Sequence, residues 1–372
     1  MNPILISLML AFLALTSCSK PEPAKIGFIA GLSGSRSDVA LSSRNGAMLA
    51  IEEQNARGGL FGQPIELIAV NNHQTIERVR AVTQTLIDEQ VDIIIGPGMS
   101  VMAVNMIDMI NAAQIPTIGT TITTTEVSNL DDYFFRTASD LSYATDYFAK
   151  AMHAKGVRNY TIIVNTSNSA YTEGWRNEFL SDALKLGLQE QRVIRYEETE
   201  DRASLLAVVN ELKSIDSQLL LLITNSVDTA VLIQQLKSID YEGIIGASEW
   251  AGTDQLIELL GGNSDGIYVN RYIDQGSNDP RMITLANTFK TRFQSELGFP
   301  ALMAYNATLI AIDVLQTSRD GPEIKAELIS RGTFSTVLAD VELNQYGDEV
   351  GAGFLTLTQI RNGQFITIDA IK

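Results

Sequence analysis

The residues best suited to chemistry in this sequence are small hydroxyls and glycines that gather in three segments, 32–35, 96–100 and 119–125. Ser100 stands where a helix should begin, so its hydroxyl and the first free backbone N–H groups could hold a carboxylate or another anion. Two plainer interpretations stay open. Ser100 could be only a helix N-cap, and the threonine run of the third segment could be only a solvated loop.

Covalent catalysis finds little support in the residues. The segment 31–35 lacks the spacing of a nucleophile elbow, and neither His73 nor His153 falls where it could pair with a serine there. The sequence has no phosphate-binding loop and no dinucleotide-binding glycine pattern after its first strand. Two histidines and one cysteine are too few ligands for a zinc site, an iron–sulfur cluster or a disulfide framework. We therefore expect no catalytic residue, no metal and no cofactor.

Length and charge narrow the class of protein further. A chain of 372 residues predicts two domains. The formal net charge is −17, from 27 basic and 44 acidic side chains. Acidity of this size repels phosphate backbones, and no run of Lys or Arg interrupts it, so we expect no nucleic-acid partner.

The hydroxyl-rich loops must be positioned by an α/β architecture, because short β-branched runs alternate with stretches of helical period. The alternation occurs twice in succession and predicts two doubly wound parallel-sheet lobes. We predict an N-terminal lobe of residues 25–140 plus 271–347 and a C-terminal lobe of residues 141–270 plus 348–372. Strands are expected at 25–30, 65–70, 92–96, 116–119, 160–164, 218–223, 243–247 and 266–270, helices at 43–57, 75–89, 101–113, 172–186, 226–238, 281–297 and 301–317, and a hairpin at 354–371.

The first 24 residues predict export. The apolar run 4–15 has the length of a signal-peptide core and is too short to span a bilayer comfortably. It leads into Leu-Thr-Ser-Cys, which resembles the bacterial lipoprotein cleavage box, so we expect residues 1–17 to be a signal peptide and Cys18 to be lipidated. Residues 18–24 would then tether a periplasmic lipoprotein that meets the membrane only through its lipid anchor. A cleaved secretory signal with an incidental cysteine is the alternative.

Ordered motifs run through nearly all of the sequence that follows. They lie at 25–34, 45–47, 51–62, 95–97, 135–137, 170–174 and 266–269. Together they resemble the leucine/isoleucine/valine-binding (branched-chain amino acid) family of periplasmic solute-binding proteins. The resemblance implies a type I periplasmic-binding fold, in which two lobes are joined by a three-strand hinge. It also implies that the lobes close on a small-molecule ligand and deliver it to the permease of an ABC importer.

The same resemblance assigns ligand-binding roles position by position. Ser100 falls on the serine that takes the ligand's α-carboxylate. Thr121 falls on the position whose backbone carbonyl receives the α-ammonium, and Thr123 on the threonine that contacts both groups. Tyr171 matches the aromatic residue of the second lobe. Glu249 is the candidate for the acidic residue that completes the ammonium site.

Two of the assigned positions have alternatives. Asn225 or Ser226 stands where relatives often place an aromatic side chain, so this part of the site departs from the family pattern. Glu249 could instead point to solvent or cap the helix near Thr253, and Trp250 would then line the cleft. These departures concern the specificity for the ligand's side chain more than the amino-acid class.

We therefore predict a protein that captures an amino acid, or a similar small amphoteric solute, between two lobes without altering it chemically, and delivers it to an ABC importer. A rival prediction is a ligand-sensing subunit that docks on a membrane receptor or kinase. Both functions use the same closure of the lobes and differ only in the partner. The sequence leaves the identity of the ligand open.

Overall fold

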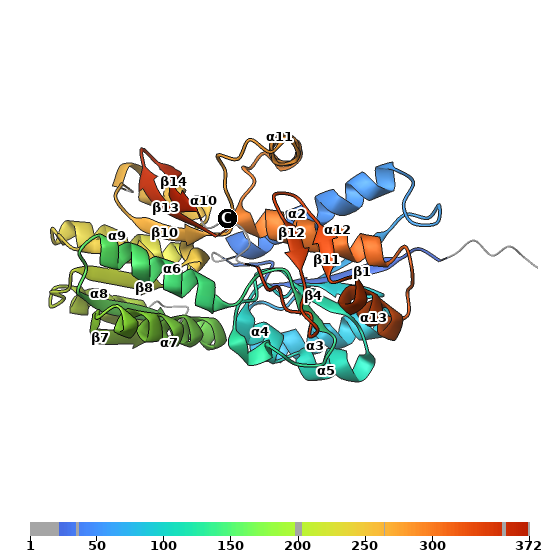
Figure 1. Ribbon diagram of the computed structural model, residues 1–372, viewed down its shortest axis with the longest axis horizontal. Coiled ribbons are helices and arrows are strands. Elements are labelled where there is room, and N and C mark those ends of the chain that lie inside the picture. The colour runs from blue at the N-terminus through green and yellow to red at the C-terminus, as the bar shows by residue number, and fades with distance from the viewer. Residues whose placement is uncertain (1–21, 35–36, 198–202, 264, 352–354, 371–372) are drawn as a thin grey trace, which may run out of the picture.

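The computed structural model describes residues 22–34, 37–197, 203–263, 265–351 and 355–370. Two α/β lobes lie side by side (Figure 1), and each is built around its own sheet. The predicted α/β fold of two doubly wound lobes is confirmed. The predicted signal peptide and the lipidation site Cys18 lie outside the described residues.

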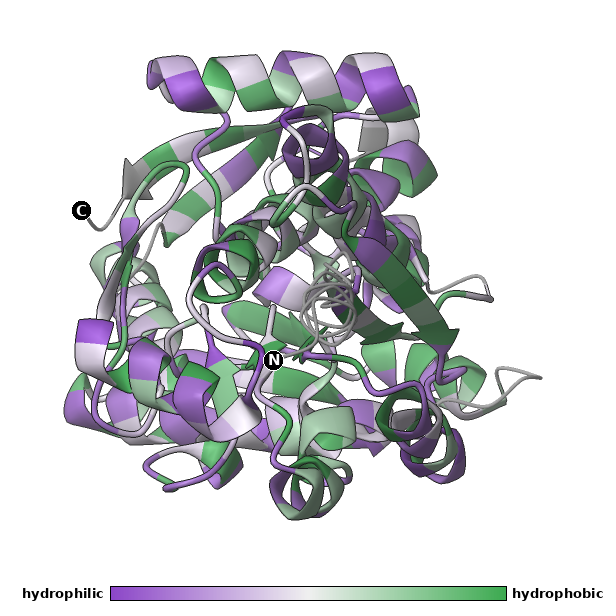
Figure 2. Ribbon diagram, turned by 90° about the vertical axis from the view of Figure 1, so that its right-hand side faces the viewer, coloured by the Kyte–Doolittle hydropathy of each residue, from purple (hydrophilic) through white to green (hydrophobic). Residues whose placement is uncertain are grey.

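The sheet of the first lobe has the strand order β2-β1-β3-β4-β5, and every pairing in it is parallel. The strands other than the edge strand β2 are almost wholly buried, as expected for a parallel sheet covered by helices on both faces. Figure 2, which faces this lobe, shows hydrophobic strands surrounded by helices with hydrophilic outer turns. The strands are β1 Lys25–Ala30, β2 Glu66–Asn71, β3 Ile93–Ile95, β4 Thr117–Gly119 and β5 Phe134–Arg136.

The sheet of the second lobe has the order β14-β13-β10-β9-β8-β6-β7. Its β7-β6-β8-β9-β10 part is parallel, and the hairpin β13–β14 is added antiparallel at the β10 edge. Asn362 and Gly363 in the hairpin turn both have positive φ, as a two-residue turn of this kind requires. The strands are β6 Asn159–Asn165, β7 Gln189–Tyr196, β8 Leu219–Ile223, β9 Ile244–Ala247, β10 Tyr268–Arg271, β13 Thr356–Arg361 and β14 Gln364–Ala370, and a separate ribbon pairs β11 Thr333–Ser335 with β12 Asp340–Glu342.

Helices α2 and α12 cross closely in the core of the first lobe. A Cβ on Gly46 would overlap the carbonyl oxygen of Ala301, so only glycine permits this approach. The helices are α2 Asp38–Ala56, α3 Ile76–Asp88, α4 Ser100–Val104, α5 Ile107–Ala113, α6 Leu141–Ala154, α7 Ser169–Lys185, α8 Ala203–Leu212, α9 Ser226–Ser238, α10 Asp254–Leu260, α11 Pro280–Phe293, α12 Phe299–Val314 and α13 Gly321–Arg331, with 3₁₀ turns η1 Thr125–Val127, η2 Thr166–Asn168, η3 Glu249–Ala251 and η4 Gly261–Asn263.

One predicted helix is divided in the structure. The pattern over 101–113 predicted a continuous helix, but α4 ends at Val104 and α5 begins at Ile107. Asn105 Nδ2 donates to the Val101 carbonyl at 2.8 Å, so a side chain occupies an acceptor near the break. The break leaves α4 as a short turn that carries Ser100.

The chain passes between the lobes after β5, after β10 and after β12. The number of crossings is the three that the resemblance implied, although the first two, residues 137–140 and 272–279, carry no named strand. The end of β5 is tied to the third crossing where Arg136 N–H donates to the Gly347 carbonyl at 3.1 Å. Irregular segments therefore connect the lobes at the described parts of these crossings.

The described end of the predicted tether is held against the first lobe. Arg319 donates to the carbonyls of Glu22 and Pro23 at 2.8 and 3.0 Å, and Ala24 is buried. The packed structure therefore begins before Lys25. Within the described ranges, the structure holds no helix with both the length and the apolar character needed to cross a membrane.

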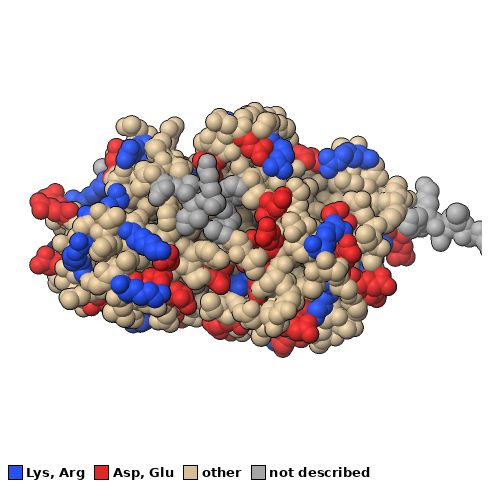
Figure 3. Space-filling model, in the orientation of Figure 1, with Lys and Arg blue, Asp and Glu red and all other residues tan. Residues whose placement is uncertain are grey.

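Basic side chains are spread over the surface rather than gathered. In Figure 3 they form separate groups, several of them beside acidic residues. Lys325, for example, pairs with Asp131 at 2.7 Å. The face in view offers no continuous basic path for a phosphate backbone.

Candidate functional site

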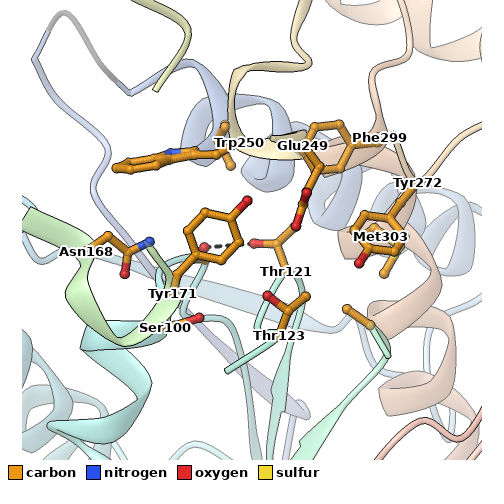
Figure 4. A pocket seen from close by; sticks show the side chains of 13 residues that line it. Ser100, Thr121, Thr123, Asn168, Tyr171, Glu249, Trp250, Tyr272, Phe299 and Met303 are labelled. Carbon is orange, nitrogen blue, oxygen red and sulfur yellow. Dashed lines mark hydrogen bonds between the residues drawn. The ribbon is translucent and has the colours of Figure 1, made fainter. Parts of the chain in front are cut away.

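A cavity lies between the lobes, at the carboxyl ends of several strands. Figure 4 shows its side chains converging from both lobes. This is the position where open α/β sheets usually bind ligands. The cavity brings together the predicted site residues Ser100, Thr121, Thr123, Tyr171, Glu249 and Trp250, and it adds Val39, Gly98, Ala138, Asn168, Tyr272, Phe299 and Met303.

Two buried hydroxyls line the first-lobe side of the cavity. Ser100 is 1% exposed and Thr123 is 2% exposed, and neither side-chain oxygen has a hydrogen-bond partner among the described residues. Ser100 is not the N-cap of α4, because Met99 holds that position. Buried hydroxyls normally find a partner, so two unpaired ones at a cavity are suited to an anionic group.

The threonine loop after β4 is mostly buried rather than solvated. Thr121 Oγ1 donates to the Gly98 carbonyl at 2.8 Å, which joins two walls of the cavity (Figure 4). Thr124 caps the turn η1 by accepting from Glu126 N–H at 3.3 Å. One threonine of the run therefore serves as a cap, while Thr121 and Thr123 reach the cavity.

Glu249 is a buried carboxylate on the second-lobe side of the cavity. It lies on η3, directly after β9, and is 4% exposed. Its Oε2 accepts a hydrogen bond from Trp175 Nε1 at 3.1 Å. Burial raises the pKa of Glu249, because low-dielectric surroundings disfavour the charged form. The alternative in which Glu249 points to solvent is wrong, although Trp250 lines the cavity as that alternative expected.

Aromatic side chains close the cavity around these polar groups. Tyr171 and Trp250 meet edge to face, with ring centroids 6.0 Å apart and an interplanar angle of 83°. Burial raises the pKa of Tyr171, and the nearby Glu249 charge raises it further, so the phenol stays protonated. Tyr272 and Phe299 complete the aromatic wall.

Asn225 and Ser226 do not line the cavity, which corrects their predicted place in the site. Asn225 is the N-cap of α9, and its side chain accepts from Asp228 N–H at 2.9 Å. Ser226 Oγ donates to Asp38 of the first lobe at 3.0 Å. Both residues follow strand β8 as predicted, but their side chains serve helix capping and contact between the lobes.

Several lining residues were missed at the sequence level. Asn168 could have been found, because it follows β6 at the carboxyl end of the sheet; its Oδ1 accepts from Val101 N–H of the other lobe at 3.1 Å. Tyr272 lies on a crossing segment. Phe299 and Met303 lie near the start of an apolar helix, where no motif marks them. Their role depends on how the lobes pack.

The side chains that line the cavity are polar at two opposite places and mostly aromatic elsewhere. Unpaired hydroxyls come from the first lobe and a carboxylate comes from the second. Such a cavity matches a solute that carries both an anionic and a cationic group. Among the described residues, no group of three or more His, Cys, Asp or Glu could hold a metal ion.

Comparison with known proteins identifies relatives along most of the chain. The periplasmic binding protein family model matches residues 23–364. The leucine-, isoleucine-, valine-, threonine-, and alanine-binding protein of Pseudomonas aeruginosa is 23% identical over 331 residues, which cover 88% of this chain and 87% of that protein.

Solved structures share the fold. The branched-chain amino acid transporter substrate binding protein LivJ of Streptococcus pneumoniae, in complex with isoleucine, has a TM-score of 0.86 at 17% identity, covering 94% of this chain and 99% of that one. An ABC-transporter solute binding protein of R. palustris, in complex with benzoate, has a TM-score of 0.84 at 15% identity, covering 94% and 96%. These ligands differ in whether they carry an ammonium group.

Proposed function

This chain belongs to the periplasmic binding protein family, and we propose that it captures an amino acid, or a similar small amphoteric solute, and delivers it to an ABC importer. The observation that carries the choice of ligand is the buried carboxylate of Glu249, which shares one cavity with the unpaired hydroxyls of Ser100 and Thr123. A zwitterionic head group satisfies both ends. The names of the relatives, which include binding proteins for leucine, isoleucine and valine, support the same class.

In the proposed complex, the hydroxyls of Ser100 and Thr123 donate to the ligand's carboxylate. Glu249 accepts from its ammonium, and the Trp175 N–H holds the carboxylate of Glu249 in place. The Thr121 carbonyl adds a second acceptor for the ammonium. The aromatic wall excludes water, which strengthens each of these charged contacts.

The test is calorimetric titration of the wild type with an amino acid and with its deaminated acid. A ligand without an ammonium leaves the Glu249 charge buried and unpaired, and removing one partner of such a pair costs about 3–5 kcal/mol. We expect the amino acid to bind tighter by orders of magnitude, and Glu249→Gln to abolish most of this preference. The exposed Glu258→Gln is the matched control and should keep it.

Equal affinity of the wild type for the two compounds would contradict the amino-acid assignment. Tighter binding of an aromatic acid such as benzoate would replace it by an acid-binding function. A preference that survives Glu249→Gln would assign the ammonium to another group.

We also propose that the protein works outside the cytoplasm as a lipoprotein anchored through Cys18. The proposal is supported by the apolar run 4–15 and the Leu-Thr-Ser-Cys sequence that follows it. Several acyl chains anchor stably where one does not. We expect Cys18→Ala to move the protein from the membrane fraction to the soluble fraction. A wild-type protein found wholly in the soluble periplasmic fraction would refute the anchor.

A further inference from the structure

A second hollow lies beside the ligand cavity and shares a wall with it; we refer to it as the second cavity. Ala138, Tyr272 and Met303 line both cavities. The side chain of Met303 is unbranched and flexible, and that of Ala138 is small, so part of this wall can yield to a ligand. The second cavity is otherwise enclosed by α12, the first crossing and the segment around the β11–β12 ribbon.

The second cavity is acidic. Glu349 and Asp340 line it, and no Lys or Arg is among its described lining residues. Glu349 is 7% exposed and forms no ion pair with any described residue; its two oxygens accept only from the backbone N–H groups of Glu342 and Gly351, at 3.0 and 2.9 Å. The pKa of Glu349 is raised to about 7, because burial disfavours its charge and no base offsets that cost.

Other groups around the cavity reinforce this character. Thr137 Oγ1 is buried and has no hydrogen-bond partner among the described residues. Arg281 approaches the cavity wall, but its guanidinium donates to the Thr336 carbonyl at 2.9 Å and pairs with Asp279 at 2.9 Å. The carboxylate of Glu349 and the hydroxyl of Thr137 are therefore available to a group that enters the second cavity.

We infer that the preferred ligand is an amino acid with a long side chain that passes Met303 and ends in a cationic nitrogen group beside Glu349 and Thr137. The inference rests on the proposed function, which supplies the binding of the ligand's head group. A buried carboxylate without a base is unfavourable, and an amine or guanidinium tip offsets that cost. An aliphatic tip in the same place supplies neither the charge nor the donors.

The test uses norleucine and lysine, which share the same linear carbon chain and differ in the terminal ammonium. In calorimetric titration we expect the wild type to bind lysine at least about tenfold tighter than norleucine. Glu349→Gln should lower this ratio by about tenfold, because the ligand loses its charged partner. Glu66→Gln removes an equal charge from an exposed residue outside the cavity lining, and it should preserve the ratio.

Norleucine binding as tightly as lysine in the wild type would overturn the inference, as would equal effects of the two glutamine variants. Should Glu349→Gln not fold, Thr137→Val takes its place and must also lower the ratio. The two proposals fail in different ways. If alanine, norleucine and lysine all fail to bind, the proposed function fails and this inference with it. If alanine or norleucine binds and lysine has no advantage, only this inference fails.

Discussion

The carboxylate of Asp38 accepts a hydrogen bond of 2.6 Å from the hydroxyl of Thr253, a residue of the opposite lobe that lies 215 positions later in the chain. The same oxygen accepts from Ser226 Oγ at 3.0 Å. Asp38 begins α2, and its neighbour Val39 lines the ligand cavity. The two lobes are thus held together at the edge of the site by a charged acceptor and two neutral donors.

We predict that Asp38→Ala weakens ligand binding by about tenfold, because these hydrogen bonds to a charged group join the two lobes beside the cavity and their loss should disfavour closure. Calorimetry gives the affinity, and small-angle scattering with and without ligand reports the closure. Glu52→Ala on the same helix is the control, since Glu52 pairs with Arg292 within the first lobe at 2.8 Å. Equal losses in both variants would show that Asp38 acts through α2 rather than through closure.

Ser100→Ala and Thr123→Val should each raise the dissociation constant of an amino-acid ligand by about tenfold, because a charged carboxylate loses one donor. The double variant should lose more than either single variant. Thr125→Val removes a hydroxyl from the same loop at an exposed position and should bind as the wild type does. Full affinity in the double variant would place the carboxylate elsewhere.

The stability of the protein should depend on pH through Asp132. Burial raises the pKa of this carboxyl to about 6 from its ordinary 3.8. The folded chain then binds the proton more tightly than the unfolded chain, so this group lowers the free energy of unfolding as pH rises from about 4 to about 6. Asp132→Asn removes the effect.

Urea unfolding at pH 4 and pH 7 gives the free energy of unfolding of Asp132→Asn and of the wild type. The difference between them should shift in favour of the variant by about 2–3 kcal/mol from pH 4 to pH 7. Asp131→Asn is the control. Asp131 is exposed, and Lys325 holds its pKa below the ordinary value, so its replacement should produce no such gain. A gain that is the same at both pH values would exclude Asp132 as the titrating group.

Asp348→Asn should destabilise the fold by about 3–5 kcal/mol, because it leaves the guanidinium of Arg136 buried without its counter-charge. The pair is separated by 2.9 Å, and the two residues are 1% and 6% exposed. Denaturant unfolding measures the loss. Asp313→Asn breaks a more exposed pair with Arg331 and should cost under about 1 kcal/mol. Losses of similar size would mean that the buried pair contributes little.

The sequence predicted the positions of site residues where those positions follow from the local pattern of strands. Ser100 and Glu249 each follow a short apolar strand, and the carboxyl ends of parallel strands meet at one edge of a sheet. Asn225 and Ser226 obey the same rule, yet their side chains cap a helix and contact Asp38. Adjacency to a strand end fixes where a residue lies, whereas its side-chain partners depend on the helix that follows and on the opposite lobe.

Other features could not be read from local pattern. Met303 reaches the cavity because α12 returns to the first lobe, and a run of apolar residues does not reveal which member borders a cavity. The division between α4 and α5 depends on one amide bonding to a nearby carbonyl, which helical periodicity does not detect. The second cavity likewise brings together residues more than 150 positions apart in the chain, such as the Thr137 hydroxyl and the Glu349 carboxylate.

The contact of Gly46 with the backbone of Ala301 has a mechanical consequence. It removes the soft layer of side chains that normally separates two helices, so α2 and α12 can neither slide nor rotate past each other without backbone collision. The N-terminal ends of these helices carry Asp38 and Phe299, one at the contact between the lobes and the other at the ligand cavity. We therefore expect α2 and α12 to move together as one unit when a ligand enters, and the crossing segments to absorb the movement between the lobes.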